Sequence, residues 1–284
     1  MRRFDLTEEE RARVAAARGK PFTAGDVAKS IVTTPKLLGP VLRSVVTGAV
    51  NGVRGNAPLA SILDMHRVRA VVPDAATGVQ WGGAAVFLEV LDGYLSPSAR
   101  VLEIGCGGGR ITRLVAPKVR EVVASDISEI MLAEARENLT GSAQNVRFAL
   151  SQPYALDGFP DSSFDVVYSH DVFFHFELNH VLALLDESRR VLKPGGACVI
   201  SFVTIDRADW AATQLELVRS AVARGTGFGP TLSRPYVAAQ LDALYETAGF
   251  EVVVRRYARL DEDADRPHYV VVGTSRDGGP PPAD

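Results

Sequence analysis

The sequence predicts a doubly wound α/β fold with a helical N-terminal extension. From residue 99 onward, short apolar runs rich in valine and isoleucine alternate with helix-like stretches, as expected for strands joined by helical crossovers. Runs of this length bounded by Gly, Pro and Asp are typical of strands buried on both faces. The chain has 284 residues, 46% of them hydrophobic, which is enough for one large domain with a well-buried core.

The expected strands lie, in chain order, within residues 99–107, 120–126, 164–170, 196–203, 250–260 and 268–276. Helices are expected between them at residues 112–116, 129–139, 181–192 and 236–249. Proline and two glycines follow Lys193 directly after the third of these helices. We therefore expect a helix stop there, and a turn that leads into the strand from Ala197 onward.

Residues 1–80 form the helical extension in this prediction. Thr7 and Glu10 make a capping box ahead of residues 11–18, and Pro40 suits the first position of a helix that reaches about Val50. The predicted domains are a helical extension or lid over residues 1–80, an α/β domain over residues 81–275 and a disordered tail over residues 276–284. An apolar stripe from Leu38 to Ala49 could serve a homodimer as well as a lid.

Charge and cysteine content exclude several classes of protein. The formal net charge of -3 gives no general attraction to a nucleic-acid backbone. Residues 1–80 nevertheless carry 12 Lys and Arg against 7 Asp and Glu, a balance that suits either an anionic substrate or partner or a solvated helical surface. Two cysteines, no secretory signal and no unbroken apolar span predict a reducing, cytoplasmic location without a membrane span.

A glycine-rich turn follows the first expected strand. Gly105, Gly107 and Gly109 alternate with other residues ahead of a helical start at Arg110. Glycine allows a sharp turn and lets a ligand lie against bare backbone, and the following helix directs its positive end at a carboxylate or phosphate. Such turns bind several nucleotide-type cofactors, and some bind no ligand.

Asp126 closes the next strand, 21 residues beyond Gly105. A carboxylate at this place can accept hydrogen bonds from both hydroxyls of a ribose. The alternative is that Asp126 or Ser128 caps the helix that begins at Glu129. Together with the glycine turn, Asp126 predicts a nucleoside-containing cofactor.

The sequence resembles the class I S-adenosylmethionine-dependent methyltransferases that act on small molecules, because three stretches and one aspartate occur in the order and spacing of that family. They are LEIGCGGG (residues 102–109), the Asp126 position, PDSSFDVV (160–167) and RVLKPGG (190–196), and the resemblance covers about residues 80–273. It implies a Rossmann-like, seven-stranded sheet of order 3-2-1-4-5-7-6 with strand 7 antiparallel. It also implies S-adenosylmethionine as the cofactor.

The resemblance places Gly105, Cys106 and Gly107 beside the methionine part of the cofactor. Glu103 would help to hold that part, Asp126 would bind the ribose and Ile127 would pack on the adenine. Gln152 stands in a loop where related proteins often carry an acid for the adenine amino group, and its carbonyl could accept the same hydrogen bond. The remaining expected cofactor-binding residues are Gly109, Ser169 and Trp81, the last as part of a lid.

The resemblance implies that the acceptor meets the methyl group at the end of the strand expected within residues 164–170, the fourth of the seven strands. His170, Asp171 and His175 lie there, so we expect a histidine to act as general base and Asp171 to fix its tautomer. A base suits a hydroxyl acceptor on a sugar or secondary metabolite, since an amine or thiol is already nucleophilic. The same histidines could instead be structural, or hold a metal with Asp171, although a single short loop makes a poor metal site and no metal is predicted.

Other functions remain open at this stage. N- or C-methylation of a small molecule is the nearest alternative, and a methyltransferase-like binding module without chemistry is another. A nicotinamide-dependent oxidoreductase is disfavoured because Arg110 stands where G-x-G-x-x-G requires its last glycine. Enzymes that methylate base amino groups resemble one another in an Asp/Asn-Pro-Pro-aromatic sequence, and this chain has Ser169-His170-Asp171-Val172 there.

Overall fold

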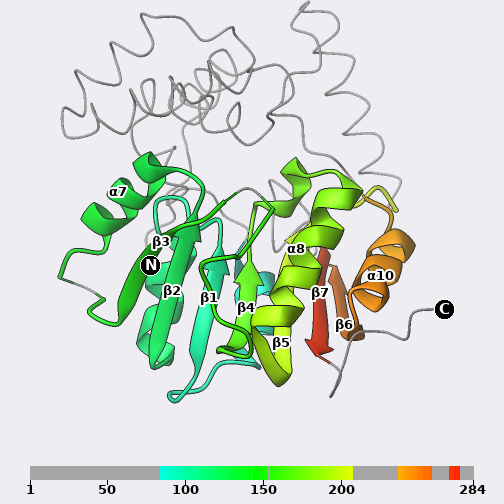
Figure 1. Ribbon diagram of the computed structural model, residues 1–284, viewed down its shortest axis with the longest axis horizontal. Coiled ribbons are helices and arrows are strands. Elements are labelled where there is room, and N and C mark those ends of the chain that lie inside the picture. Colours follow the sequence, from blue (N-terminus) through cyan, green and yellow to red (C-terminus); the bar gives the residue numbers. More distant parts are fainter. Residues whose placement is uncertain (1–83, 142, 153, 207–235, 258–268, 276–284) are drawn as a thin grey trace, which may run out of the picture.

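A single mixed sheet organises the described part of the protein. The computed structural model describes residues 84–141, 143–152, 154–206, 236–257 and 269–275. Within them the strand order is β3-β2-β1-β4-β5-β7-β6. Neighbours among β1 to β5 are parallel, whereas β7 runs antiparallel to β5 and β6 (Figure 1). The strands are β1 (Arg100–Ile104), β2 (Glu121–Asp126), β3 (Val146–Leu150), β4 (Phe164–Ser169), β5 (Leu192–Phe202), β6 (Phe250–Tyr257) and β7 (Tyr269–Ser275). The predicted order and the antiparallel seventh strand are confirmed.

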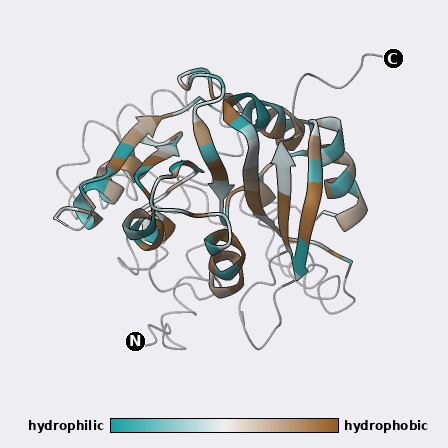
Figure 2. Ribbon diagram, turned by 90° about the horizontal axis from the view of Figure 1, so that it is seen from below, coloured by the Kyte–Doolittle hydropathy of each residue, from teal (hydrophilic) through white to brown (hydrophobic). Residues whose placement is uncertain are grey.

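Helices cover both faces of the sheet (Figure 2). On one face, a core cluster takes side chains from α5 (Ala85–Asp92), α6 (Arg110–Val115) and α7 (Glu129–Asn138). On the other face, a second cluster takes side chains from α8 (Leu178–Val191) and α10 (Ala238–Thr247). Short 3-10 turns η3 (Ala116–Lys118) and η4 (Phe173–His175) complete the described elements. The arrangement is the predicted doubly wound α/β sandwich.

The strands are apolar on successive residues because each of their faces meets a helical layer. In β1, Val101 packs in the cluster with α5, α6 and α7, whereas Leu102 packs in the cluster with α8 and α10. Both side chains are fully buried. Burial of one such side chain contributes about 1.5–3 kcal/mol, so unbroken valine and isoleucine runs are required here.

Two elements were not among those predicted from the apolar pattern. β3 lies at the edge of the sheet, and its residues are half-buried or exposed, including Leu150 at 53%. Its apolar run is interrupted by Arg147, so it lacked the signal of a strand buried on both faces. The helix α5 also begins earlier than any predicted element of the α/β domain, and it buries Val86, Phe87 and Leu91 on the sheet.

The predicted turn after α8 is instead a bulge inside β5. The strand starts at Leu192, directly after α8, and pairs first with Phe164 and then, after a register shift, through Ala197 with Val166. The intervening Gly195 has φ +72°, a conformation that glycine adopts without strain. The helix stop was correct, but the Pro-Gly-Gly stretch stays in the sheet because it can bulge between two paired positions.

Several predictions concern parts of the chain outside the described residues. These are the helical extension, Trp81 as a lid residue and the disordered tail. Among the described helices, none has the length and apolar content needed to cross a membrane. The described residues also contain no group of three or more His, Cys, Asp or Glu side chains arranged to hold a metal ion.

Candidate functional site

The loops that follow β1, β2 and β4 meet at one edge of the sheet. These strands are parallel, and their carboxyl ends point to the same edge (Figure 1). β1 and β4 are neighbours at the point where the chain order reverses, since β2 and β3 lie to one side and β5 to the other. Ligands of open α/β sheets bind in the crevice outside such a reversal point.

The glycine turn after β1 is closely packed at Gly105 and Gly109 and open at Gly107. Gly105 has φ +74°, and a Cβ atom there would lie 2.4 Å from Cγ2 of Val172. Gly107 has φ +52°, but no atom of the described residues lies within 4 Å of the Cβ that it lacks. Gly109, at φ +85°, begins α6 and approaches Leu139. The turn is therefore packed against protein at its two ends and open at Gly107, where a ligand has room to lie on the backbone.

Asp126 ends β2 directly beside this opening. One carboxylate oxygen accepts the backbone N–H of Gly107 at 2.9 Å and the other accepts that of Ser128 at 2.9 Å. A carboxylate has about four acceptor positions, so Asp126 can still accept from a ligand hydroxyl beside its backbone donors, which also include Ile127. Burial raises the pKa of Asp126 to about 6, although its backbone hydrogen bonds oppose this shift. The helix cap is Ser128, whose hydroxyl accepts from Met131 N, so Asp126 is not the N-cap of α7.

Glu103 is a second buried carboxylate, located in β1 under the glycine turn. One of its oxygens accepts hydrogen bonds from the hydroxyl of Thr112 at 2.5 Å and from that of Tyr168 at 3.1 Å. Burial raises its pKa to about 7, against the opposing effect of these hydrogen bonds. Glu103 and Asp126 together place two potential negative charges beside a site expected to take a cationic cofactor.

The loop after β4 is fastened to the strands around it. The Ser169 hydroxyl donates to the Ile104 carbonyl at 2.7 Å, and the backbone N–H of Asp171 donates to the Ser201 hydroxyl at 3.1 Å. Asp171 has φ +62°, a left-handed conformation that Asp and Asn tolerate better than most residues. The Val172 side chain then fills the space over Gly105. The loop after β4 and the glycine turn are thus in direct contact.

Asp171 has two polar neighbours at the same oxygen. Arg110 Nη2 lies 2.8 Å from Asp171 Oδ2, and His170 Nε2 lies 3.5 Å from it. The His170 ring is stacked on Phe87 of α5 with centroids 4.5 Å apart, and its side chain is fully buried. The predicted His170–Asp171 pair is therefore brought together, but the shorter contact of Asp171 is to Arg110.

His175 is less buried and belongs to the turn η4. Its ring lies 4.3 Å from that of Phe174. The Tyr236 hydroxyl lies 2.7 Å from the Phe173 carbonyl and 2.5 Å from the Phe176 carbonyl, so it holds the turn from both ends. The neighbouring Phe173, Phe174 and Phe176 are buried, and Phe174 forms a small core cluster with Val203.

The other predicted cofactor residues are near the same edge. Ile127 directly follows Asp126 and is partly exposed, as contact with an adenine requires. Gln152 is exposed and forms an isolated bridge with Ala155, in a loop joined to β2 through the hydrogen bond from Ser151 N to Asp126 O. Cys106 is buried within the glycine turn, and burial raises the pKa of its thiol well above the ordinary value.

Sequence reasoning missed four residues of this region. Three of them contact the loop after β4: Phe87 stacks on His170, Arg110 forms an ion pair with Asp171, and the Ser201 hydroxyl accepts from Asp171 N. The fourth is Tyr236, whose hydroxyl is hydrogen-bonded to the turn η4. The apolar i, i+4 pair of Phe87 and Leu91 was the available signal for α5. The contacts of the other residues join positions far apart in the chain, which local patterns do not reveal.

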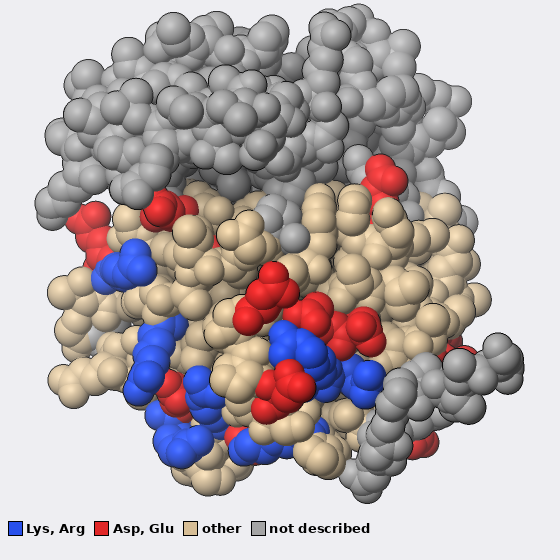
Figure 3. Space-filling view, in the orientation of Figure 1, with Lys and Arg blue, Asp and Glu red and all other residues tan. Residues whose placement is uncertain are grey.

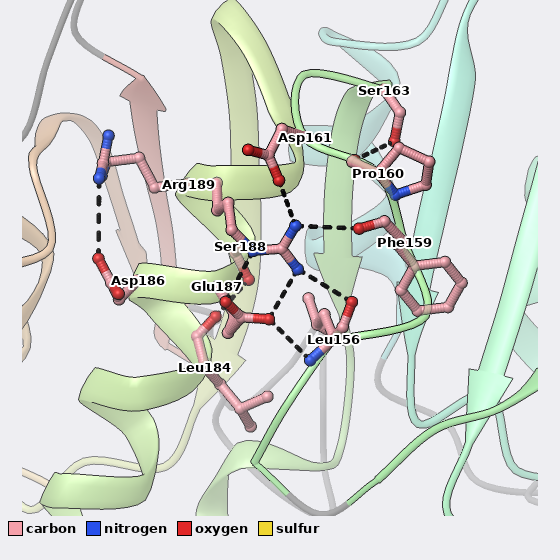
Figure 4. A network of polar contacts seen from close by, with 11 residues as sticks. Leu156, Phe159, Pro160, Asp161, Ser163, Leu184, Asp186, Glu187, Ser188 and Arg189 are labelled. Carbon is pink, nitrogen blue, oxygen red and sulfur yellow. Dashed lines mark hydrogen bonds and ion pairs between the residues drawn. The ribbon is translucent and has the colours of Figure 1, made fainter.

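The stretches PDSSFDVV and RVLKPGG lie at the opposite edge of the sheet. Arg190 uses all five of its N–H donors, two of them to Glu187 and the others to acceptors of the loop before β4: Leu156 O, Phe159 O and Asp161 Oδ1 (Figure 4). Lys193 Nζ pairs with Asp165 at 2.7 Å, and Asp165 also accepts from Arg100 N at the start of β1. Figure 3 shows blue and red side chains intermixed over the lower half of this face. These stretches anchor the fold and do not line the site.

The comparisons with known proteins agree with this architecture. A family model described as a methyltransferase domain matches residues 102–200, from β1 into β5. Residues 102–200 therefore have the sequence pattern of a methyltransferase domain. The glycine turn and Asp126 lie at the start of this matched segment and offer an open backbone and a carboxylate acceptor, which fit a nucleoside-containing cofactor.

Two curated relatives and one solved structure illustrate the similarity of the methyltransferase domain. It is 38% identical over 132 residues to the 2-methyl-6-phytyl-1,4-hydroquinone methyltransferase of Synechocystis, covering 46% of this chain and 36% of that protein. It is 30% identical over 158 residues to a ubiquinone biosynthesis O-methyltransferase of Sinorhizobium fredii, covering 55% and 61%. A SAM-dependent methyltransferase of Methanosarcina mazei shares the fold with a TM-score of 0.56 at 19% identity, covering 66% of this chain and 97% of that one. The chain spans less than two thirds of the length of the curated relatives it matches.

Proposed function

We propose that this protein is an enzyme that transfers a methyl group from S-adenosylmethionine to a small-molecule acceptor. The observation that carries the proposal is the Asp126 carboxylate at the end of β2, which lies beside the open Gly107 backbone and keeps acceptor capacity for a ligand hydroxyl. The two curated relatives described above are named for a hydroquinone and for ubiquinone biosynthesis, which supports a small acceptor.

The residues of the carboxyl edge divide the cofactor between them in this proposal. The backbone of Gly105, Cys106 and Gly107 holds the methionine part, and Glu103 supports that part from below. Asp126 binds the ribose hydroxyls, while the adenine lies between Ile127 and the loop of Gln152. Ser169 and Gly109 fix the ends of the two loops that line the site, through the Ser169 hydrogen bond to Ile104 and the start of α6. S-adenosylmethionine supplies an activated methyl group on a good leaving group, so the protein chiefly orients the acceptor and excludes water.

The acceptor atom is a hydroxyl oxygen in this proposal, on a sugar or another secondary metabolite. An oxygen acceptor must lose a proton, and two histidines follow β4 where the acceptor approaches. The partial exposure of His175 on η4 suits proton transfer with an acceptor better than the full burial of the His170 side chain. We therefore assign the base to His175, with His170 and Asp171 supporting the loop that carries it.

Binding and activity separate the parts of this proposal. Calorimetric titration of the wild-type protein with S-adenosylmethionine and S-adenosylhomocysteine should give micromolar affinity, and Asp126→Ala should lose it. Asp242→Asn is the matched control, since it removes a carboxylate from α10, away from the carboxyl edge of β1 and β2. Failure of the wild-type protein to bind either compound would refute the cofactor assignment.

Acceptor screening with isotopically labelled cofactor tests the reaction itself. His175→Ala should abolish labelling of a hydroxyl acceptor while cofactor affinity stays at the wild-type value. Label found on nitrogen or carbon would replace O-methylation by the alternatives, and cofactor binding without transfer to any acceptor class would favour a binding module. An anionic or glycosylated acceptor is expected to bind best, because of the basic balance of residues 1–80.

The organisation of the whole chain is part of the proposal. We assign residues 1–80 to a helical lid, residues 81–275 to the methyltransferase domain and residues 276–284 to a tail, with a homodimer as one use of the apolar stripe from Leu38 to Ala49. Cys106 and Cys198 are both buried and neither forms a disulfide. This supports a reducing, cytoplasmic location, which fractionation of the cells that make the protein would test.

A further inference from the structure

A buried tyrosine of β4 donates to the carboxylate that lies under the glycine turn. Tyr168 and Glu103 are register partners in the neighbouring parallel strands β4 and β1. The Tyr168 hydroxyl lies 3.1 Å from Oε2 of Glu103, and both side chains are buried. The tyrosine ring lies beside that of Phe87, with centroids 6.5 Å apart. A phenylalanine would suit such an apolar position without needing a partner, so the hydroxyl answers a requirement of Glu103 and not of the core.

A second hydroxyl donates to the same carboxylate oxygen. Thr112 is fully buried in α6, and its Oγ1 lies 2.5 Å from Oε2 of Glu103. The two donors therefore reach Oε2 from different elements, β4 and α6. Two such donors fix the plane of a carboxylate and stabilise its charged form. In the proposed arrangement this leaves Oε1 as the oxygen that serves the methionine part of the cofactor.

Other charged and titratable groups of the described residues also act on Glu103. Arg110 of α6 favours its charged form, whereas Asp126 of β2 disfavours it. Cys106 and Tyr168 also interact with Glu103, but burial raises the pKa of each well above its ordinary value, so both are uncharged near neutral pH. Burial raises the pKa of Glu103 to about 7 in spite of its two hydroxyl donors. Loss of either donor should therefore raise the pKa of Glu103 further.

We propose that Tyr168 is a positioning residue for the cofactor, which holds Oε2 of Glu103 so that the carboxylate presents its charge to the methionine part. The inference rests on the proposed cofactor binding, and Tyr168 acts through Glu103 without touching the reacting atoms. The methionine part carries an ammonium group, whose attraction to Glu103 requires an ionised and correctly turned carboxylate. S-adenosylhomocysteine carries the same ammonium group without the sulfonium charge, so it is the simplest probe of this contact.

Calorimetric dissociation constants of S-adenosylhomocysteine, measured from about pH 5.5 to about pH 8.5, test this role. The affinity of the wild-type protein should rise with pH as Glu103 ionises around its pKa of about 7. Tyr168→Phe should move this rise upward by about one pH unit, the shift expected for the loss of one hydrogen bond to a charged group. Its affinity should therefore be about threefold below wild type at about pH 7, and within about 1.5-fold of wild type at about pH 8.5.

A double-mutant cycle assigns the pH dependence to Glu103. Glu103→Gln should remove this part of the rise and leave the part that belongs to Asp126, whose pKa is about 6. In the Glu103→Gln background, Tyr168→Phe should have no further effect on the pH profile, because the group through which it acts no longer titrates.

Matched variants separate this role from a structural one. Tyr245→Phe removes an equally buried hydroxyl from the core cluster on the other face of the sheet, and should leave the pH profile unchanged. Thr112→Val removes the other donor to Oε2 and should shift the profile in the same direction as Tyr168→Phe. Thr112→Ser keeps the hydroxyl and should retain the wild-type profile. Thr112→Val takes the place of Tyr168→Phe if that variant does not fold.

The possible outcomes differ in what they refute. If Tyr168→Phe lowers the affinity by one factor at every pH, or not at all, the hydroxyl has only a structural role and the inference is overturned. An equal effect on 5′-methylthioadenosine, which has the adenosine part but lacks the amino-acid part, would overturn it as well. A wild-type protein that binds neither S-adenosylhomocysteine nor S-adenosylmethionine would instead refute the proposed function.

Discussion

Replacing Glu103 by glutamine should stabilise the cofactor-free protein and weaken its affinity for S-adenosylmethionine. Glu103 is 2% exposed, and the hydroxyls of Thr112 and Tyr168 both donate to the same carboxylate oxygen. The glutamine carbonyl oxygen has two lone pairs and can accept both hydrogen bonds. The substitution therefore removes the buried charge while retaining the volume of the side chain and its donors.

The magnitude follows from the pKa of the carboxyl. Burial raises the pKa of Glu103 from 4.5 to about 7, a difference that corresponds to about 3 kcal/mol against folding once the group is ionised in both states. The folded protein holds this proton more tightly than the unfolded chain does. The stability contributed by Glu103 is therefore lost as pH rises from 4.5 to about 7 and regained as pH falls through the same window.

Urea denaturation at a series of pH values measures this effect. At about pH 8, Glu103→Gln should raise the free energy of unfolding by about 1–3 kcal/mol, with the lower figure allowing for an imperfect fit of the amide group. Between about pH 6 and pH 7 its stability should change less with pH than that of wild type. Asp126 has a pKa of about 6 and titrates mostly below this window.

Cofactor affinity should change in the opposite direction. The loss of a negative charge beside a cationic ligand should weaken S-adenosylmethionine roughly tenfold. Asp242→Asn changes the net charge equally at an ion pair with Arg255 and should leave the pH profile unchanged. The reasoning would fail if Glu103→Gln were less stable than wild type at about pH 8, or if its stability kept the wild-type slope between about pH 6 and pH 7.

Three other substitutions test the packing around the site and its anchor. Arg190→Met leaves Leu156 O, Phe159 O and two carboxylates without their guanidinium donor, and should lower the free energy of unfolding in urea by about 2–3 kcal/mol. The cofactor affinity of the folded protein should not change, and a loss of stability below about 0.5 kcal/mol would contradict the role of Arg190 as an anchor between α8 and the loop before β4. Gly105→Ala places a methyl group 2.4 Å from Val172 Cγ2 at φ +74° and should destabilise by about 2–4 kcal/mol, partly relieved by Val172→Ala in a double-mutant cycle. Tyr236→Phe should cost about 1–2 kcal/mol and speed hydrogen exchange in the turn η4, and unaltered exchange there would show that the hydroxyl does not hold the turn.

The sheet could be predicted from the sequence because its parallel strands must be apolar on both faces. Val101 and Leu102 belong to different cores, so their adjacency was a direct sign of burial on both sides. The edge strand β3 lacks that requirement, which is why its interrupted pattern gave no signal. The bulge at Gly195 was missed because a turn and a bulge need the same residue types, and the choice depends on the pairing of β4 with β5.

The candidate site was predictable where one element carries the chemistry. The glycine turn and Asp126 could each be predicted from the residue type and from its position at the end of a strand. The partner of Asp171 was not predictable, because Arg110 lies 61 residues away in the sequence. The expected His170–Asp171 contact is present, but it is one of several contacts in a cluster that also contains Arg110 and the stacked Phe87.

The Arg190 network has a consequence for how this protein can change over generations. The hydrogen bonds of Arg190 join α8 to the loop before β4, and the residues after β4 take no part in them. New side chains at the partly exposed positions between His170 and Phe176 leave this source of stability untouched, so such variants are selected chiefly on what they bind. A duplicated copy could acquire a different acceptor through one short loop while it kept the anchor and the cofactor of its parent.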